Sequence, residues 1–288
     1  MPSAALKIQV LLRPFFMALA LLTRIPVAKY VSQQWLPHEW QDKDLGRSAL
    51  WYPVVGVVIA SILMLAICLL PSHISPWVAA IFLLVLWVGT TGALHLDGVA
   101  DCVDAMYAGH SVPNVLNEPN DKNPKIDKVL KVLKDPTIGA MAVIALVIVL
   151  MSKTILLASL WILLDASIIL PVIFSISIAR VVALLFMVYT PYTPYASHQG
   201  LGAVIAMHTP QKIALLVSSI FGVALCVYFV IYASWLMMFV ALLTMAAVFY
   251  FWRSYWVKTL GGFVGDAIGC LIETMEVVIL FLFYCALL

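Results

Sequence analysis

The sequence predicts an all-α polytopic integral membrane protein, and three observations lead to this fold class. Of its 288 residues, 64% are hydrophobic and 10% are charged, whereas soluble domains carry about 25% charged residues. The mean hydropathy is +1.08. Several apolar runs reach the roughly 20 residues that a helix needs to cross a bilayer. No hydrophilic stretch is long enough to fold separately, so we expect one membrane-embedded domain over residues 1–288.

About seven transmembrane helices are expected. The apolar stretch from Ile213 to Trp252 is too long for one span and is divided near Ala233 and Ser234, which predicts a helical hairpin. The expected spans cover residues 50–70, 77–96, 138–160, 167–189, 213–232, 233–252 and 267–288.

Most lysines and arginines fall in loops that seven spans would place on one side of the membrane. The opposite links, near residues 71–76, 161–166 and 232–234, contain none. By the positive-inside rule the charged side is cytoplasmic. We therefore expect a multi-pass protein of the cell (inner) membrane, with its amino terminus and its functional site on the cytoplasmic side.

A shorter apolar stretch precedes the first span. Residues Val10–Leu22 are interrupted by Arg13 and Pro14, and no small-residue cleavage site follows them. This pattern predicts a retained helix that is interfacial or re-entrant, rather than a signal peptide.

A cytoplasmic amphipathic helix is expected after the polar loop that begins at Asn117. Its apolar residues recur with the i, i+3, i+4, i+7 spacing of one helix face, and its lysines occupy the other face. We favour a helix that lies on anionic lipid headgroups; the alternative is a lid whose lysines attract phosphorylated substrates. The apolar residues are Ile126, Val129, Leu130 and Leu133, and the lysines are Lys125, Lys128, Lys131 and Lys134.

Net charge and cysteine spacing exclude several kinds of partner. A formal charge of +2 is too small to indicate nucleic-acid binding. The five cysteines lack the paired spacing of zinc sites, so we interpret them as small core residues rather than as disulfides or zinc ligands.

The first candidate site is the run from Gly92 to Asp104, which reads GALHLDGVADCVD. Asp97, Asp101 and Asp104 are spaced i, i+4, i+7, so a helix places all three carboxylates on one face. Like charges this close repel each other, and a divalent cation with oxygen ligands, such as Mg²⁺, would neutralise them. His95 faces differently and is either a base or ligand, or a hydrogen-bonded residue at a helix end.

A second acidic face follows near the carboxyl end. Asp266 and Glu273 are spaced i, i+7, and Glu276 continues the line. Carboxylates inside a membrane segment usually mark functional sites. The glycines at 261, 262, 265 and 269 allow close helix packing or close approach of the backbone to a ligand. We expect both acidic faces to share one cation site.

Two basic residues lie inside expected spans. Arg180 requires an anionic partner, which is either one of these acids or a substrate phosphate. Lys153 lies nearer the outer half of its span, and we expect it to snorkel towards the membrane surface. A purely structural alternative is that these two residues pair with the second acidic face.

These motifs resemble a known family. Residues 95–104, HLDGVADCVD, closely resemble the HLDGxADxxD signature of cobalamin synthases, the membrane enzymes also called adenosylcobinamide-GDP ribazoletransferases. Four further stretches agree in order: LTRIP at 22–26, YPVVG at 52–56, GLG at 200–202 and TLGGFVGD at 259–266, which continues to Glu273. The resemblance covers most of the chain.

This chain departs from the family pattern in three places. Where the family has a KDSRxG-like element, residues 134–139 read KDPTIG, so Thr137 or Ile138 replaces the arginine. The residue after Asp104 is Ala105 instead of glycine, and the loop from Asp104 to Asp135 is longer than usual. Any phosphate contact of that arginine is therefore in question here.

The resemblance implies an activity: condensation of adenosylcobinamide-GDP with α-ribazole or its 5′-phosphate, with release of GMP. It implies Mg²⁺ as cofactor and the lipid bilayer, corrinoid nucleotide and α-ribazole as partners, with no nucleic acid. A homo-oligomer or a complex with other corrinoid-biosynthesis proteins is also compatible.

The candidate residues fall into three groups. Asp97, Asp101, Asp104 and His95 are the catalytic candidates, one aspartate being the general base. Metal-ligand candidates are Asp97, Asp101, Asp104, Asp266 and Glu273. Substrate-binding candidates are Arg24, Lys134, Asp135, Arg180, Gly262 and Gly265.

Two other functions are weighed against this one. The start DGVAD at residues 97–101 weakly resembles the DGxxAR of CDP-alcohol phosphotransferases, but an aspartate replaces the arginine. An ion-coupled transporter would also place charges inside its spans. A transporter needs them near the middle of the membrane, whereas Asp97, Asp104 and Asp266 are expected at the cytoplasmic ends of spans.

Overall fold

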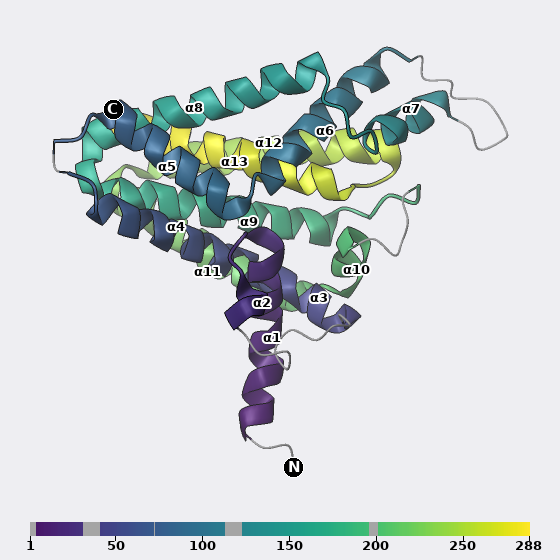
Figure 1. The fold of residues 1–288 in the computed structure, drawn as a ribbon, viewed down its shortest axis with the longest axis horizontal. Helices are drawn as coiled ribbons and strands as arrows, with labels where there is room; N and C mark the ends of the chain where they lie inside the picture. The colour runs from purple at the N-terminus through teal and green to yellow at the C-terminus, as the bar shows by residue number, and fades with distance from the viewer. Residues whose placement is uncertain (1–3, 31–40, 72, 113–122, 196–200) are drawn as a thin grey trace.

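The computed structural model describes residues 4–30, 41–71, 73–112, 123–195 and 201–288, and the regular secondary structure within these ranges is helical (Figure 1). The only extended pairing in them is an isolated bridge between Tyr192 and Phe263. The predicted all-α fold class is confirmed. Residues 113–122 and Gly200 of the GLG motif lie outside the described residues.

The spans expected from hydropathy are present as helices. Six helical segments are long and apolar enough to cross a membrane in the described part of the chain, and a bent pair makes a seventh. The first of these segments runs from Asp42 to Cys68 and contains α4 (Tyr52–Cys68). The other five are α8 (Ala140–Leu164), α9 (Ile169–Tyr189), α11 (Gln211–Tyr232), α12 (Trp235–Leu260) and α13 (Gly265–Ala286). The bent pair is α5 (Pro76–Thr91) and α6 (Leu94–His110).

The bent pair corrects one expected boundary. The span predicted over 77–96 stops at Thr91, and α6 leaves α5 at an angle of 87°. Gly92 and Ala93 form the elbow with φ of +64° and +60°, a left-handed backbone that ends α5. The first acidic run therefore forms a separate helix rather than the end of a straight span.

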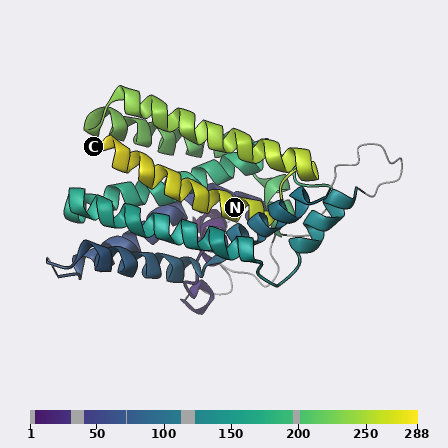
Figure 2. The same cartoon turned by 90° about the horizontal axis from the view of Figure 1, so that it is seen from above.

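Helices α9 and α13 form the centre of the bundle. In the candidate spans, 72% of the α9 window and 56% of the α13 window are buried, against 6% for α12. Figure 2 shows α13, in yellow, between α12 and α8. Large apolar side chains on the outer helices are exposed, as expected of surfaces that contact lipid; examples are Val85, Ile148, Leu216 and Leu243.

Short helices gather towards one end of the bundle (Figure 1). They are α2 (Val27–Tyr30), α3 (Asp42–Ser48), α7 (Pro124–Val132) and α10 (Leu201–His208). Helix α1 (Ala4–Leu22) runs across the direction of the bundle helices, and its apolar part, Leu12–Leu22, is too short for a full span. This agrees with the expected interfacial or re-entrant helix.

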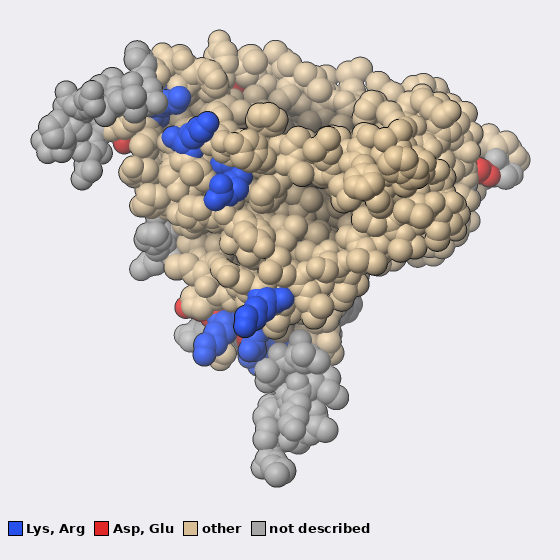
Figure 3. All heavy atoms as spheres, turned by 180° about the vertical axis from the view of Figure 1, so that it is seen from behind, with Lys and Arg blue, Asp and Glu red and all other residues tan. Residues whose placement is uncertain are grey.

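The charged side chains confirm that one end of the molecule is basic. Lysines and arginines gather at the end that carries the short helices (Figure 3). Arg13 of α1 pairs with Asp44 of α3 at 3.3 Å, which anchors α1 there.

The amphipathic helix α7 uses its apolar stripe differently from our expectation. Val129 is fully buried and faces Gly109 of α6, where a β-carbon on the glycine would lie 2.9 Å from the valine methyl. The apolar stripe therefore packs against protein rather than on the bilayer surface. Lys128, Lys131 and Lys134 are exposed on the other face.

Four charged side chains are buried between α8, α9 and α13. The Lys153 ammonium contacts Glu273 at 2.6 Å and also Glu276, and Arg180 donates to Glu276 at 2.8 Å. Lys153 is 2% exposed and lies 4.5 Å from the centre of the Trp87 ring on α5. The prediction that Lys153 snorkels is wrong, because two carboxylates compensate its charge inside the bundle.

Replacing Lys153 with methionine should destabilise the protein strongly. The change leaves Glu273 and Glu276 buried with one cation, and removing one partner of a buried ion pair costs about 3–5 kcal/mol. Thermal unfolding in detergent measures the effect. Lys258→Met removes an exposed lysine at the end of α12 and serves as the control. Equal midpoints for the two variants would contradict the importance of the buried pairs.

Candidate active site

The site begins at the elbow between α5 and α6. The Arg24 backbone N–H donates to the Thr90 carbonyl at 2.8 Å, and the Arg24 side chain lies directly over Gly92. A β-carbon on Gly92 would overlap the arginine side chain, so this position needs glycine for both space and its positive φ. Because Gly92 directly precedes α6, the exposed Arg24 side chain lies beside the start of that helix.

Helix α6 presents the three aspartates on one face, as its spacing predicts. Asp97 is exposed, while Asp101 and Asp104 are partly buried. Val99 and Cys102 lie in the core on the other side of the helix. The carboxylates therefore line the boundary between the bundle and its basic end.

Two glycines bring α13 against α6. A β-carbon on Gly98 would lie 2.7 Å from the Asp266 carbonyl oxygen, and one on Gly269 would lie 3.3 Å from the His95 Cα. Asp266 is thereby placed beside the acidic face of α6. Asp266, Asp97 and Asp104 are all close enough to the Asp101 carboxylate for their charges to repel it.

The two acidic motifs therefore meet at the same end of the bundle. Gly98, the neighbour of Asp97, packs on the Asp266 backbone, so the two aspartates are not on opposite sides of the membrane. Among the described residues, no three His, Cys, Asp or Glu side chains are arranged to hold a metal ion by themselves. A cation here would need oxygen ligands from a substrate or water as well.

Asp104 has a structural partner that the sequence did not reveal. Its carboxylate accepts the Gly139 N–H at 2.6 Å and the Ala142 N–H at 3.0 Å, and so caps the start of α8. A β-carbon on Gly139 would lie 2.7 Å from this carboxylate, which explains why a glycine occupies that position. Asp104 thus ties α6 to α8.

The other candidates, Glu273, Arg180 and His95, are buried inside the bundle rather than on the acidic face. Glu273 is bonded to Lys153, and Arg180 to Glu276, so the acid-paired alternative for Arg180 is the one observed. Arg180 is fully buried, which places it away from a substrate phosphate in this conformation. His95 is 2% exposed, and neither of its ring nitrogens has a hydrogen-bond partner in the described part of the chain.

Lys134 and Asp135 are exposed in the segment between α7 and α8, close in sequence to Gly139. The Thr137 hydroxyl and N–H both donate to Asp135 Oδ1, at 2.6 Å and 3.0 Å. These bonds lower the pKa of Asp135. Arg24 lies near Asp97, the first aspartate of the acidic face, and the segment with Lys134 and Asp135 lies near Asp104, the last one. Polar groups therefore flank both ends of the acidic face.

Gly262 and Gly265 belong to the loop that positions Asp266. The Phe263 N–H donates to the Pro191 carbonyl at 2.9 Å, and the Thr193 N–H donates to the Phe263 carbonyl at 3.0 Å. A β-carbon on Gly262 would overlap the Pro191 carbonyl, whereas Gly265 is exposed with open space around it. Gly262 therefore serves close backbone packing, and Gly265 leaves the approach to Asp266 open.

Sequence reasoning missed Tyr192. Its ring lies 3.7 Å from the position of a β-carbon on Gly202 of α10, and Gly202 also adjoins Gly265. Burial, and then the charge of Asp266, raises the pKa of Tyr192. The run YTPY at residues 189–192, at the end of an expected span, was the available signal.

The fold and this site define a polytopic membrane protein with a carboxylate-lined face on α6 and the start of α13. The sequence profile of cobalamin-5-phosphate synthases matches residues 14–284, and the chain belongs to that family.

Named relatives agree with this assignment. An adenosylcobinamide-GDP ribazoletransferase of Pseudomonas putida is 35% identical over 266 residues, which cover 92% of this chain and 96% of the relative. Proteins of the same name from Stutzerimonas stutzeri and Acinetobacter baumannii are 34% and 31% identical, and in both cases 93–94% of this chain and 96% of the relative are covered. No solved structure matches this chain.

Substituting Gly98 with alanine should destabilise the contact between α6 and α13. The new methyl group would press on the Asp266 backbone, and such overpacking typically costs about 1–3 kcal/mol. Gly89→Ala is the matched control, because nothing lies within 4 Å of its added β-carbon. A thermal midpoint that falls for Gly98→Ala alone supports the contact; unchanged midpoints for both would refute it.

Proposed function

We propose that this protein condenses adenosylcobinamide-GDP with α-ribazole or α-ribazole 5′-phosphate, giving adenosylcobalamin or its 5′-phosphate and GMP. The family and the names of the relatives support this reaction. The structural observation that carries it is the meeting of Asp97, Asp101 and Asp266, from two family motifs, on one face at the basic end.

The chemistry requires a ribose hydroxyl to attack the phosphorus that bears the corrinoid. A new P–O bond forms to the nucleoside, the bond to the second phosphate breaks, and GMP leaves. Reactions of this type rely on positioning and on charge neutralisation. One aspartate of α6 takes the hydroxyl proton as general base, and Asp97 and Asp101 are the candidates.

Mg²⁺ fits the donor set of this face. It prefers oxygen ligands and is usually held by one or two carboxylates together with waters and substrate phosphates. One or two of Asp97, Asp101 and Asp266 would hold it together with waters and substrate phosphates, whereas Asp104 already accepts two backbone N–H groups and Glu273 is bonded to Lys153. When bound, the ion would neutralise charge on the transferred phosphoryl group.

The arrangement of buried charges favours an enzyme over an ion-coupled transporter. A transporter would need charges that are open to an ion in the middle of the membrane. Here Lys153, Arg180, Glu273 and Glu276 are closed off and balance one another, while the accessible carboxylates lie at the basic end.

Replacing Asp97 or Asp101 with asparagine should abolish turnover without unfolding the protein. Removing one charge from a crowded acidic face relieves repulsion, but a neutral amide binds magnesium poorly and cannot take a proton. We expect GMP release to fall by about a hundredfold or more.

The assay combines purified protein, adenosylcobinamide-GDP, α-ribazole and magnesium, with expression level recorded for each variant. Asp165→Asn, an exposed acid at the α8–α9 turn, is the control. Near-normal GMP release in either α6 variant would remove that residue from the active site.

We also propose that the basic end faces the cytoplasm of an inner membrane, because the loops at the other end contain no lysine or arginine. An affinity tag inserted between residues 117 and 123, mostly outside the described residues, should be labelled only after the cells are opened. Labelling from outside intact cells would reverse the topology.

A further inference from the structure

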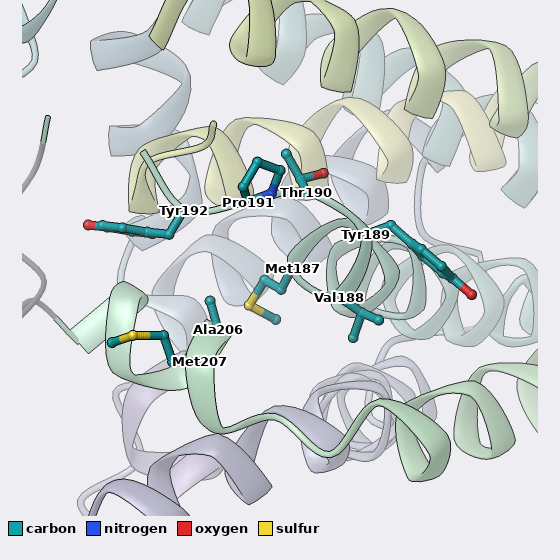
Figure 4. Close-up of a pocket in the computed structure, with 8 residues that line it drawn as sticks. All are labelled: Met187, Val188, Tyr189, Thr190, Pro191, Tyr192, Ala206 and Met207. Carbon is teal, nitrogen blue, oxygen red and sulfur yellow. The ribbon is translucent and has the colours of Figure 1, made fainter. Parts of the chain in front are cut away.

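A cavity of about 220 Å³ lies where the end of α9 meets α10. It is lined by Met187, Val188, Tyr189, Thr190, Pro191, Tyr192, Ala206 and Met207 (Figure 4). Tyr189 and Tyr192 point away from each other at its two ends, and Ala206 and Met207 of α10 form one side.

The α10 wall of this cavity is fixed in place. The Thr209 hydroxyl contacts the Gly46 carbonyl of α3 at 3.2 Å, and a β-carbon on Gly46 would overlap the His208 backbone. The opposite wall, at 190–192, is held by its backbone hydrogen bonds to Phe263. The cavity is therefore a formed feature of the fold rather than a gap beside a loose segment.

Tyr192 connects this cavity to the acidic face. Tyr192 lines one end of the cavity with its ring directed outward, and the Asp266 charge is close enough to act on its hydroxyl. Gly202 and Gly265 leave no side chain between the start of α10 and the start of α13. A ligand held in the cavity would therefore have its outer end next to Asp266.

The size and walls of the cavity restrict the ligand. Pockets for drug-sized molecules measure roughly 300–1,000 Å³, so this smaller cavity cannot enclose a corrinoid. The thioethers of Met187 and Met207 offer polarisable walls, and the Tyr192 ring lies at one end of the cavity, a combination that suits an aromatic ring. The Thr190 hydroxyl is buried and does not reach this space, so the side chains on the cavity wall are apolar apart from the tyrosine hydroxyls.

We propose that this cavity binds the aromatic base of the nucleoside substrate, so that the ribose hydroxyl is directed to the acidic face. The inference rests on the proposed function. The base lies beside Met187 and Met207, with the Tyr192 ring at its outer end. Tyr192 is a substrate-positioning residue in this account, and the corrinoid nucleotide binds outside the cavity.

Filling the cavity tests this proposal directly. Ala206→Leu adds three carbons to its wall, and one methylene in a tight pocket already changes specificity by about 10–200-fold. We expect the KM for α-ribazole to rise at least about tenfold. The KM for adenosylcobinamide-GDP should stay unchanged, as should kcat at saturating nucleoside.

The matched control is Ala246→Leu, which fills a different, apolar cavity between α9, α11 and α12 and should leave both KM values unchanged. If the Ala206→Leu protein does not accumulate, the Met207→Ala variant tests the same proposal. Met207 is 57% exposed, so its truncation should not prevent folding, and it too should raise the KM for α-ribazole alone.

The outcomes separate the two proposals. No GMP release by the wild-type protein would overturn the proposed function and this inference with it. Wild-type turnover with an unchanged KM for α-ribazole in both cavity variants would overturn the inference alone. A rise in the KM for adenosylcobinamide-GDP instead would assign the cavity to the other substrate and also refute it.

Discussion

The rest of the structure depends on the compensation of four charges inside the bundle. Lys153 and Arg180 are surrounded by apolar helices, where an unpaired charge would be very unfavourable. Glu273 and Glu276 on α13 balance them, and the Ser175 hydroxyl adds a bond to the Glu276 carbonyl. Helix α13 is thereby held against both α8 and α9, with one rotation that satisfies all these contacts. The buried acids of α13 therefore fix the position of this helix, whereas its first acid, Asp266, stays partly exposed.

Placement of α13 in turn determines the geometry of the site. Gly269 and Gly98 let α13 approach α6 closely, so Asp266 stands beside Asp97 and Asp101. Asp104 fastens the far part of α6 to the start of α8 through two backbone N–H groups. The loop at 261–264 and the segment at 190–193 are joined by hydrogen bonds, which carries Tyr192 to the same place. Carboxylates from distant parts of the chain thus form one face without any of them being buried unpaired.

Much of this arrangement could be predicted from local patterns, and the rest could not. Apolar run lengths predicted the spans, and the i, i+4, i+7 spacing predicted the acidic face of α6. The elbow at Gly92 and Ala93 escaped prediction because it depends on Arg24, which packs there from a distant part of the sequence. Lys153 was predicted to snorkel because its partners are 120 residues or more away. The spacing of the apolar stripe of α7 is the same for a helix that packs on lipid and for one that packs on protein. The contact of Val129 with Gly109 of α6 shows that it packs on protein.

The central claim is that α6 and α13 lie in contact and bring two acidic motifs together, and two native cysteines test it most directly. Cys102 of α6 and Cys270 of α13 are buried with their thiols close enough to interact. The measurement uses a variant that keeps only these two cysteines, treated in membranes with a lipid-permeable oxidant and then cut by a protease in the loop between α6 and α7. The account predicts that the two fragments stay linked until a reductant is added. Fragments that separate without reductant, while a thiol reagent shows both cysteines consumed, would contradict it.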